Sequence, residues 1–199
     1  PRPAGGGPVH GLPPSELERT LENGILTGLA AGVPMGLFMM AASLAWGHGG
    51  AFTPFYRIAA VLDRAAFDIS LEEAATGSRF WLEPQSALPG ACVHLALAGL
   101  FGVLFVLLAQ EGRGARPVAL VLAGAAWGLA VAVVMVPVLR LVGERVGGGA
   151  LIAEVPAQLG WPTYLAMHLV YGLALGAVVA LRAARRRRTE GPVPGPGTA

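Results

Sequence analysis

The sequence predicts an all-α membrane protein, a bundle of four transmembrane helices, from its composition, its hydropathy and the lengths of its apolar stretches. The 199 residues are 54% hydrophobic and 13% charged, and the mean hydropathy is +0.61. This is far more apolar than a soluble domain of the same length. A helix needs about 20 mostly apolar residues to cross a hydrocarbon core. Four stretches meet that requirement, at about 24–46, 91–109, 117–142 and 164–181.

The two ends of the chain are rich in Pro and Gly and cannot bury enough apolar surface to offset the entropy of ordering. We therefore expect residues 1–14 and 189–199 to be disordered and cytoplasmic, and residues 15–188 to form the membrane domain. No signal-peptide pattern precedes the first span, so we expect that span to direct insertion.

The charge distribution predicts the orientation. All 14 basic residues are arginine, and with four spans nine of them fall on the side of the termini: Arg2, Arg19, Arg113, Arg116, Arg182, Arg185, Arg186, Arg187 and Arg188. The positive-inside rule then places both termini in the cytoplasm. The dense run from Arg182 to Arg188 is interpreted as an anchor to anionic lipid headgroups rather than a nucleic-acid site.

The connection between the first two spans, about residues 47–90, is long and predicted to face outward. Within it "PFYRIAAVLDRAAF" predicts an amphipathic helix lying in the membrane interface. Its apolar face would carry Phe55, Ile58, Ala59, Leu62 and Ala66. The acids of this loop are spread along it, and we expect them to form a solvated face: Asp63, Asp68, Glu72, Glu73 and Glu83.

Glycines recur every fourth residue in the first span, at Gly24, Gly28, Gly32 and Gly36. Helices in lipid associate through such faces of small residues. Because a four-helix bundle is too small to hide every face, we expect the glycine faces of the first and fourth spans to pack against a second copy or other membrane-protein subunits. The leading interpretation is a non-catalytic accessory or structural subunit.

An internal repeat relates the two halves of the chain. "HLALAGLFG" from His94 in the second span matches "HLVYGLALG" from His168 in the fourth, and Pro89 and Pro162 precede them in what we expect to be the first helical turns. The other two spans match more weakly, through Gly32 and Gly36 against Gly124 and Gly128; Gly172 and Gly176 complete the predicted packing set. The sequence therefore predicts two helical hairpins of the same orientation, a parallel repeat related by an axis along the membrane normal.

The repeat places His94 and His168 at a similar depth on helices that run in the same direction. The simplest interpretation is two neutral histidines that each bond a neighbouring carbonyl or interfacial water, in helices that their glycines bring into direct contact. A second hypothesis is a bis-histidine haem b site for electron transfer, because imidazole is a good ligand for iron. A third is a lipid- or quinone-binding groove beneath the histidines. His48 could join them in an outer metal site, and His10 has no evident partner.

Several function classes are excluded by what the sequence lacks. No Asp or Glu lies within the four spans, so a charge-driven transporter is not expected. The single cysteine, Cys92, permits no intramolecular disulfide and no cysteine-based metal site, and we expect it to be buried. The chain has no nucleophile elbow, phosphate loop or HExxH motif, and we expect neither an enzyme nor a nucleic-acid-binding protein.

The glycine-spaced first span, "TPFYRIAA" after it and "HLVYGLALG" in the last span together resemble a group of uncharacterised bacterial four-helix integral membrane proteins. The resemblance covers about residues 24–176. It implies a four-span bundle in the bacterial inner (cytoplasmic) membrane, and it implies no activity.

Overall fold

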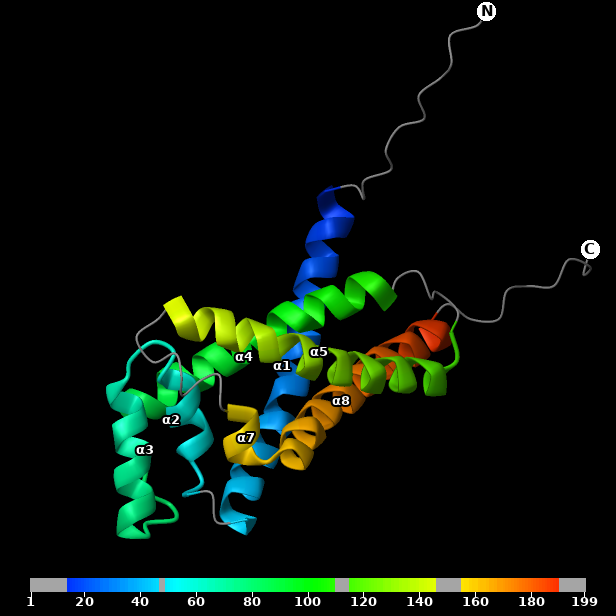
Figure 1. Ribbon diagram of the computed structural model, residues 1–199. Helices are drawn as coiled ribbons and strands as arrows, with labels where there is room; N and C mark the ends of the chain where they lie inside the picture. Colours follow the sequence, from blue (N-terminus) through cyan, green and yellow to red (C-terminus); the bar gives the residue numbers. More distant parts are fainter. Residues whose placement is uncertain (1–13, 47–48, 110–114, 146–154, 190–199) are drawn as a thin grey trace, which may run out of the picture.

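A computed structural model of the chain describes residues 14–46, 49–109, 115–145 and 155–189 (Figure 1). Throughout these residues the regular structure is helical, which confirms the predicted all-α class. The elements are α1 (Pro14–Ala45), α2 (Thr53–Ala59), α3 (Ala65–Thr76), α4 (Pro84–Ala109), α5 (Pro117–Arg145), α7 (Val155–Leu159) and α8 (Trp161–Thr189). The segments predicted to be disordered lie almost entirely outside the described residues.

Four of these helices, α1, α4, α5 and α8, are long and apolar enough to cross a membrane. Large apolar side chains cover their outer surfaces, as at Leu37 (59% exposed) and Leu122 (63% exposed). Exposing such a surface to water is unfavourable in free energy, whereas contact with lipid tails carries no such penalty. The chain is a multi-pass membrane protein.

The helices extend beyond the predicted spans because hydropathy marks the apolar part of a helix and not its polar ends. α4 begins at Pro84, so this proline occupies the first turn and Pro89 lies inside the helix. The prediction that Pro89 would open the helix is therefore wrong. Pro162 does lie in the first turn of α8, as predicted.

The spans associate as two hairpins. α1 packs along α4, and α5 packs along α8; the hairpins join mainly where α1 meets α8, whereas α4 and α5 scarcely touch. The contacts place α1 and α8 in the middle of the bundle, with α4 against α1 and α5 against α8. In Figure 1, α2, α3 and α7 gather at one end of the bundle. This arrangement leaves the outer helices of the two hairpins facing each other across a space.

The predicted single amphipathic helix over residues 54–67 is in fact two helices. The chain turns at residues 60–64, and the amide of Ala65 donates to the Asp63 carboxylate at 2.9 Å, which starts α3 anew. Of the residues predicted to form one apolar face, Ala59 and Ala66 are buried within the protein, whereas Leu62 is 64% exposed. α2 packs on α4, and α3 packs on α2, so this segment folds against the bundle.

Candidate functional site

Glycines bring α1 and α4 into contact along their backbones. A Cβ added to Gly28 would lie 2.8 Å from the Cα of Gly99, and one added to Gly102 would lie 2.7 Å from the amide nitrogen of Gly28. At Gly24 an added Cβ would lie 2.6 Å from the Cα of Val103. No side chain fits at these distances, so glycine is required for the helices to approach this closely.

The second hairpin is held in the same way. A Cβ added to Gly124 would lie 2.8 Å from the Cα of Gly176, and one added to Gly128 would lie 3.0 Å from the Cα of Gly172. These glycines therefore pack helix on helix, but they do so within the chain. The prediction that the glycine faces of the first and fourth spans dock a partner is not met, because the protein's own helices already cover them.

The contacts also correct the register of the repeat. Gly28 lies against Gly102, and Gly124 lies against Gly176; since Gly102 and Gly176 are equivalent in the repeat, Gly28 is the counterpart of Gly124. The comparison of the two halves of the sequence pairs Gly32 with Gly124, and this pairing differs by one helical turn from the one that the contacts give. Weak similarity between apolar helices cannot fix a register that backbone contacts define.

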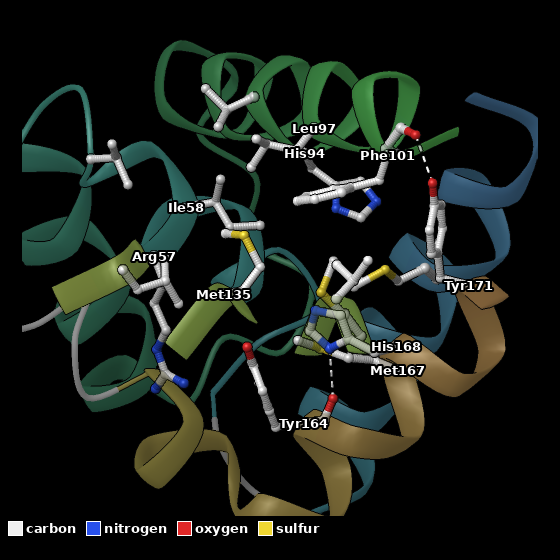
Figure 2. Close-up of a pocket in the computed structure, with 17 residues that line it drawn as sticks. Arg57, Ile58, His94, Leu97, Phe101, Met135, Tyr164, Met167, His168 and Tyr171 are labelled. Atoms are coloured by element: carbon white, nitrogen blue, oxygen red, sulfur yellow. Dashed lines mark hydrogen bonds between the residues drawn. The ribbon is translucent and has the colours of Figure 1, made fainter. Parts of the chain in front are cut away.

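A pocket of about 140 Å³ lies between the two hairpins and is lined by all four spans and α2 (Figure 2). Four methionines contribute to its wall: Met35, Met39, Met135 and Met167. Methionine is flexible and polarisable and adapts to irregular apolar shapes. Polar groups enter this apolar wall at a few points only: Arg57, His94, Tyr164, His168 and Tyr171.

His94 reaches the pocket from α4 and is 8% exposed. Its Nε2 lies 2.9 Å from the carbonyl oxygen of Gly32 on α1. A Cβ on Gly32 would lie 3.8 Å from that nitrogen and 2.8 Å from the Cβ of Ala98, so the glycine keeps α1 close to both residues. Because a carbonyl only accepts, Nε2 carries the proton, and Nδ1 holds the lone pair of the neutral ring.

His168 reaches the same pocket from α8 and is 6% exposed. Its Nδ1 donates to the carbonyl oxygen of Tyr164, one turn earlier, at 2.8 Å. In the neutral ring Nε2 therefore holds the lone pair. Figure 2 shows His94 and His168 on opposite sides of the pocket, on α4 and α8. Of the two predicted partners, a carbonyl or interfacial water, both histidines use a carbonyl. The prediction that glycines bring these two helices into direct contact is wrong.

Two tyrosines from α8 tie the walls of the pocket together. The Tyr171 hydroxyl donates to the carbonyl oxygen of Ala98 on α4 at 2.7 Å, and thereby links the two hairpins. The Tyr164 hydroxyl donates to the carbonyl oxygen of Ala132 on α5 at 3.0 Å, within the second hairpin. Each hydroxyl proton is thus committed to the bundle, which leaves the histidines as the polar groups best placed to meet a ligand.

α2 forms one end of the pocket. A Cβ on Gly90 would lie 2.7 Å from the carbonyl carbon of Phe55, so α4 accepts α2 at a glycine. The Phe55 ring stands edge-on to the His94 ring at 6.1 Å between centroids, while Ile58 and Arg57 complete this end. Burial lowers the pKa of the Arg57 guanidinium below its ordinary value.

A buried carboxyl group holds α2 and α3 to the end of α1. Glu73 is 1% exposed, and the Thr53 hydroxyl donates to its Oε2 at 3.0 Å. The Gly50 amide donates to the Thr53 hydroxyl at 2.8 Å, and the Ser43 hydroxyl of α1 donates to the Gly50 carbonyl at 2.7 Å. Burial raises the pKa of Glu73, and the bond from Thr53 opposes that effect. The prediction that Glu73 belongs to a solvated face is therefore wrong.

At the opposite end of the bundle the arginines divide into two groups. Arg182 turns inward from α8, and its Nη1 donates to the Thr27 hydroxyl and, at 3.0 Å, to the carbonyl oxygen of Asn23. The rest of the run is exposed, with Arg187 donating to the carbonyl oxygen of Ala115 at 3.0 Å. The positive-inside rule gave all these arginines the same role. It did not predict that Arg182 connects α8 to α1 by hydrogen bonds.

Of the remaining candidates from the sequence, Cys92 is described and does not line the pocket. His10 and His48 lie outside the described residues. Cys92 is exposed on α4 rather than buried as predicted. Within the described ranges, no group of three or more His, Cys, Asp or Glu side chains could hold a metal ion.

No protein-family model, curated protein sequence or solved structure matches this chain. The resemblance to bacterial four-helix membrane proteins therefore stays a prediction.

Proposed function

We propose that this membrane protein binds a ring-bearing amphipathic molecule, taken from the bilayer, in the pocket between its two hairpins. The observation that carries the proposal is the pocket itself, about 140 Å³ with an apolar wall and two opposed histidines. An apolar cavity of about 150 Å³ accommodates one benzene ring. A bilayer molecule would enter between α4 and α5, where the hairpins scarcely touch.

The histidine tautomers indicate the chemistry of that ring. Nδ1 of His94 and Nε2 of His168 are acceptors, because the other nitrogen of each ring donates to a carbonyl. A charged imidazole in the hydrocarbon region is unfavourable, which supports the neutral form. A ligand that satisfies both acceptors must donate, so a ring with hydroxyl groups, such as a quinol, fits better than an oxidised quinone.

The haem hypothesis fits this site poorly. A porphyrin joins four pyrrole rings in one plane, whereas the pocket has room for about one ring. Nε2 of His94 is held by the Gly32 carbonyl, so Nδ1 is the one nitrogen of this ring that could bind iron without breaking that bond. A reduced-minus-oxidised visible spectrum of haem-supplemented protein tests this directly, and a haem band would overturn the assignment.

We further propose a non-catalytic role in the bacterial inner membrane with both termini in the cytoplasm, as the charge distribution and the resemblance predict. An accessory role in a larger or homo-oligomeric assembly stays a prediction. A partner would have to use lipid-facing surfaces of the bundle, because the glycine faces are covered.

The proposal is tested by filling the pocket. Val131, 5% exposed on α5, lines it, whereas Val133 on the same helix is 67% exposed. Val131→Phe places a ring of the protein's own in the pocket, and Val133→Phe is the matched control. Organic extracts of the purified proteins should contain a ring-bearing lipid for wild type and Val133→Phe, but not for Val131→Phe. Equal recovery from all three proteins would count against the proposal.

A further inference from the structure

A second cavity, of about 550 Å³, lies between α1, α4 and α8 at the end of the bundle opposite α2 and α3. Its apolar wall includes Val106 and Ala109 of α4 and Val179 of α8. Its polar wall carries three arginines, Arg19, Arg182 and Arg186. Among the described residues that line it, Glu16 is the one acid. The cavity thus combines an apolar side with an excess of positive charge.

From this combination we infer that the cavity binds the phosphate group of an anionic phospholipid, whose acyl chains lie along the apolar wall. Arginine presents a planar set of donors that matches phosphate oxygens, and it remains charged at any physiological pH. Basic pockets between transmembrane helices are suited to anionic headgroups. This binding is independent of the ring pocket, which lies at the other end of α8.

Arg182 supplies the fixed part of the site. Its Nη1 is held by the Asn23 carbonyl and the Thr27 hydroxyl on α1, and Thr27 in turn donates to the Asn23 carbonyl at 2.6 Å. Thr27 is fully buried, so the guanidinium is anchored at the seam of α1 and α8. The arginine is therefore positioned before any ligand arrives, which lowers the entropic cost of binding.

Arg19 and Arg186 lie on the rim, one on each of the helices that Arg182 joins. A phosphate contacted by both would hold α1 and α8 together at their polar ends. Arg185 and Arg188 are on the same helix as Arg186 but do not line the cavity. They provide a control with the same change of charge.

The test compares retained lipid by native mass spectrometry of the detergent-purified protein, after incubation with phosphatidylglycerol or phosphatidylcholine. Wild type should retain one phosphatidylglycerol in preference to phosphatidylcholine. The R19Q/R186Q variant should retain it about five-fold more weakly for each arginine removed, and R185Q/R188Q should behave as wild type. Competition with glycerol phosphate distinguishes a lipid from a soluble ligand: displacement of the lipid at equal concentration would show that the acyl chains contribute nothing.

Equal retention by R19Q/R186Q and wild type, or equal losses in both double variants, would overturn the inference. So would equal retention of phosphatidylglycerol and phosphatidylcholine, or displacement of the lipid by glycerol phosphate at equal concentration. Because Arg182→Gln removes bonds inside the bundle, the conclusion does not depend on that variant. The helical content of the same R19Q/R186Q preparation, measured by circular dichroism, should match that of wild type and shows that the variant is folded.

Discussion

Glycine spacing alone does not identify which glycines the bundle requires. Gly28 and Gly36 belong to the same series in α1, yet their surroundings differ. An added Cβ at Gly28 meets backbone at 2.8 Å, whereas at Gly36 its nearest neighbour is the tip of the Phe55 ring at 3.5 Å, an ordinary contact. The series therefore combines positions where glycine is essential with one where alanine fits.

We expect Gly28→Ala to lower the free energy of unfolding by about 1–3 kcal/mol, because α1 and α4 must separate to admit the methyl group. Gly36→Ala should be neutral or stabilising by up to about 1 kcal/mol, since alanine favours the helix. Thermal unfolding in detergent compares the two variants with wild type. Equal loss of stability in both would contradict the contact geometry.

Glu73 predicts a specific pH dependence. Burial raises its pKa above the ordinary value of 4.5, so the unfolded state binds fewer protons than the folded state between the two pKa values. Stability from this group is therefore fully present below the unfolded pKa and is lost as the pH rises through the folded pKa. Glu73→Gln keeps an acceptor for Thr53 and removes the charge.

Thermal unfolding of wild type and Glu73→Gln from pH 4.5 to pH 8 measures this effect. We expect the Tm of wild type to fall across this range relative to that of the variant, and the variant to be more stable at pH 8 by about 1 kcal/mol. Parallel curves would show that Glu73 is not the titrating group.

Among the elements, the junction between the hairpins is held differently from the hairpins themselves. Each hairpin has glycine contacts along its length, whereas a bond from Tyr171 crosses the pocket to α4. Tyr171→Phe removes this link between the hairpins. Tyr164→Phe removes a similar bond inside the second hairpin.

Each tyrosine variant should lower stability by about 0.6 kcal/mol, and by no more than about 1.7 kcal/mol. Only Tyr171→Phe should also weaken ligand binding in the pocket. This variant removes the hydrogen bond between α8 and α4, whereas Tyr164→Phe removes a bond between α8 and α5. The comparison uses thermal unfolding and ligand titration on the same preparations. A similar loss of binding in both variants would contradict the assigned role of Tyr171.

The sequence predicted four spans, two hairpins and two histidines that each bond a carbonyl or interfacial water. Hydropathy determines the spans locally, whereas the bond of His94 to Gly32 depends on the packing of α1 against α4. The break between α2 and α3 was missed because the apolar period continues through Asp63. The turn depends on the Asp63 side chain, which accepts a hydrogen bond from the Ala65 amide. The burial of Glu73 was missed because it depends on Thr53 and Gly50, which only the folded loop brings together.

At the scale of the whole molecule, the arginine distribution predicts that both termini face the cytoplasm. Fusions of a periplasm-active and a cytoplasm-active reporter to the C-terminus, each made in bacteria, measure this. We expect activity from the cytoplasmic reporter alone. Activity from the periplasmic reporter would reverse the orientation and place the arginine-lined cavity on the outer side.

The pocket is also a property of the whole molecule, and the sequence indicated only part of it. The repeat identified His94 and His168 as a pair, but not the space between them. That space exists because the essential glycines draw α4 to α1 and α8 to α5, rather than α4 to α8. The spacing of the histidines does not predict that methionines and α2 form part of the pocket wall.

Calorimetric titration of the purified protein with a short-chain quinol, beside the corresponding quinone, tests the central claim most directly. We predict that wild type and Val133→Phe bind the quinol more tightly than the quinone, and that Val131→Phe binds neither. Binding of the quinol to Val131→Phe with the affinity of wild type, or no binding to wild type, would contradict the assignment of this pocket as a ligand site.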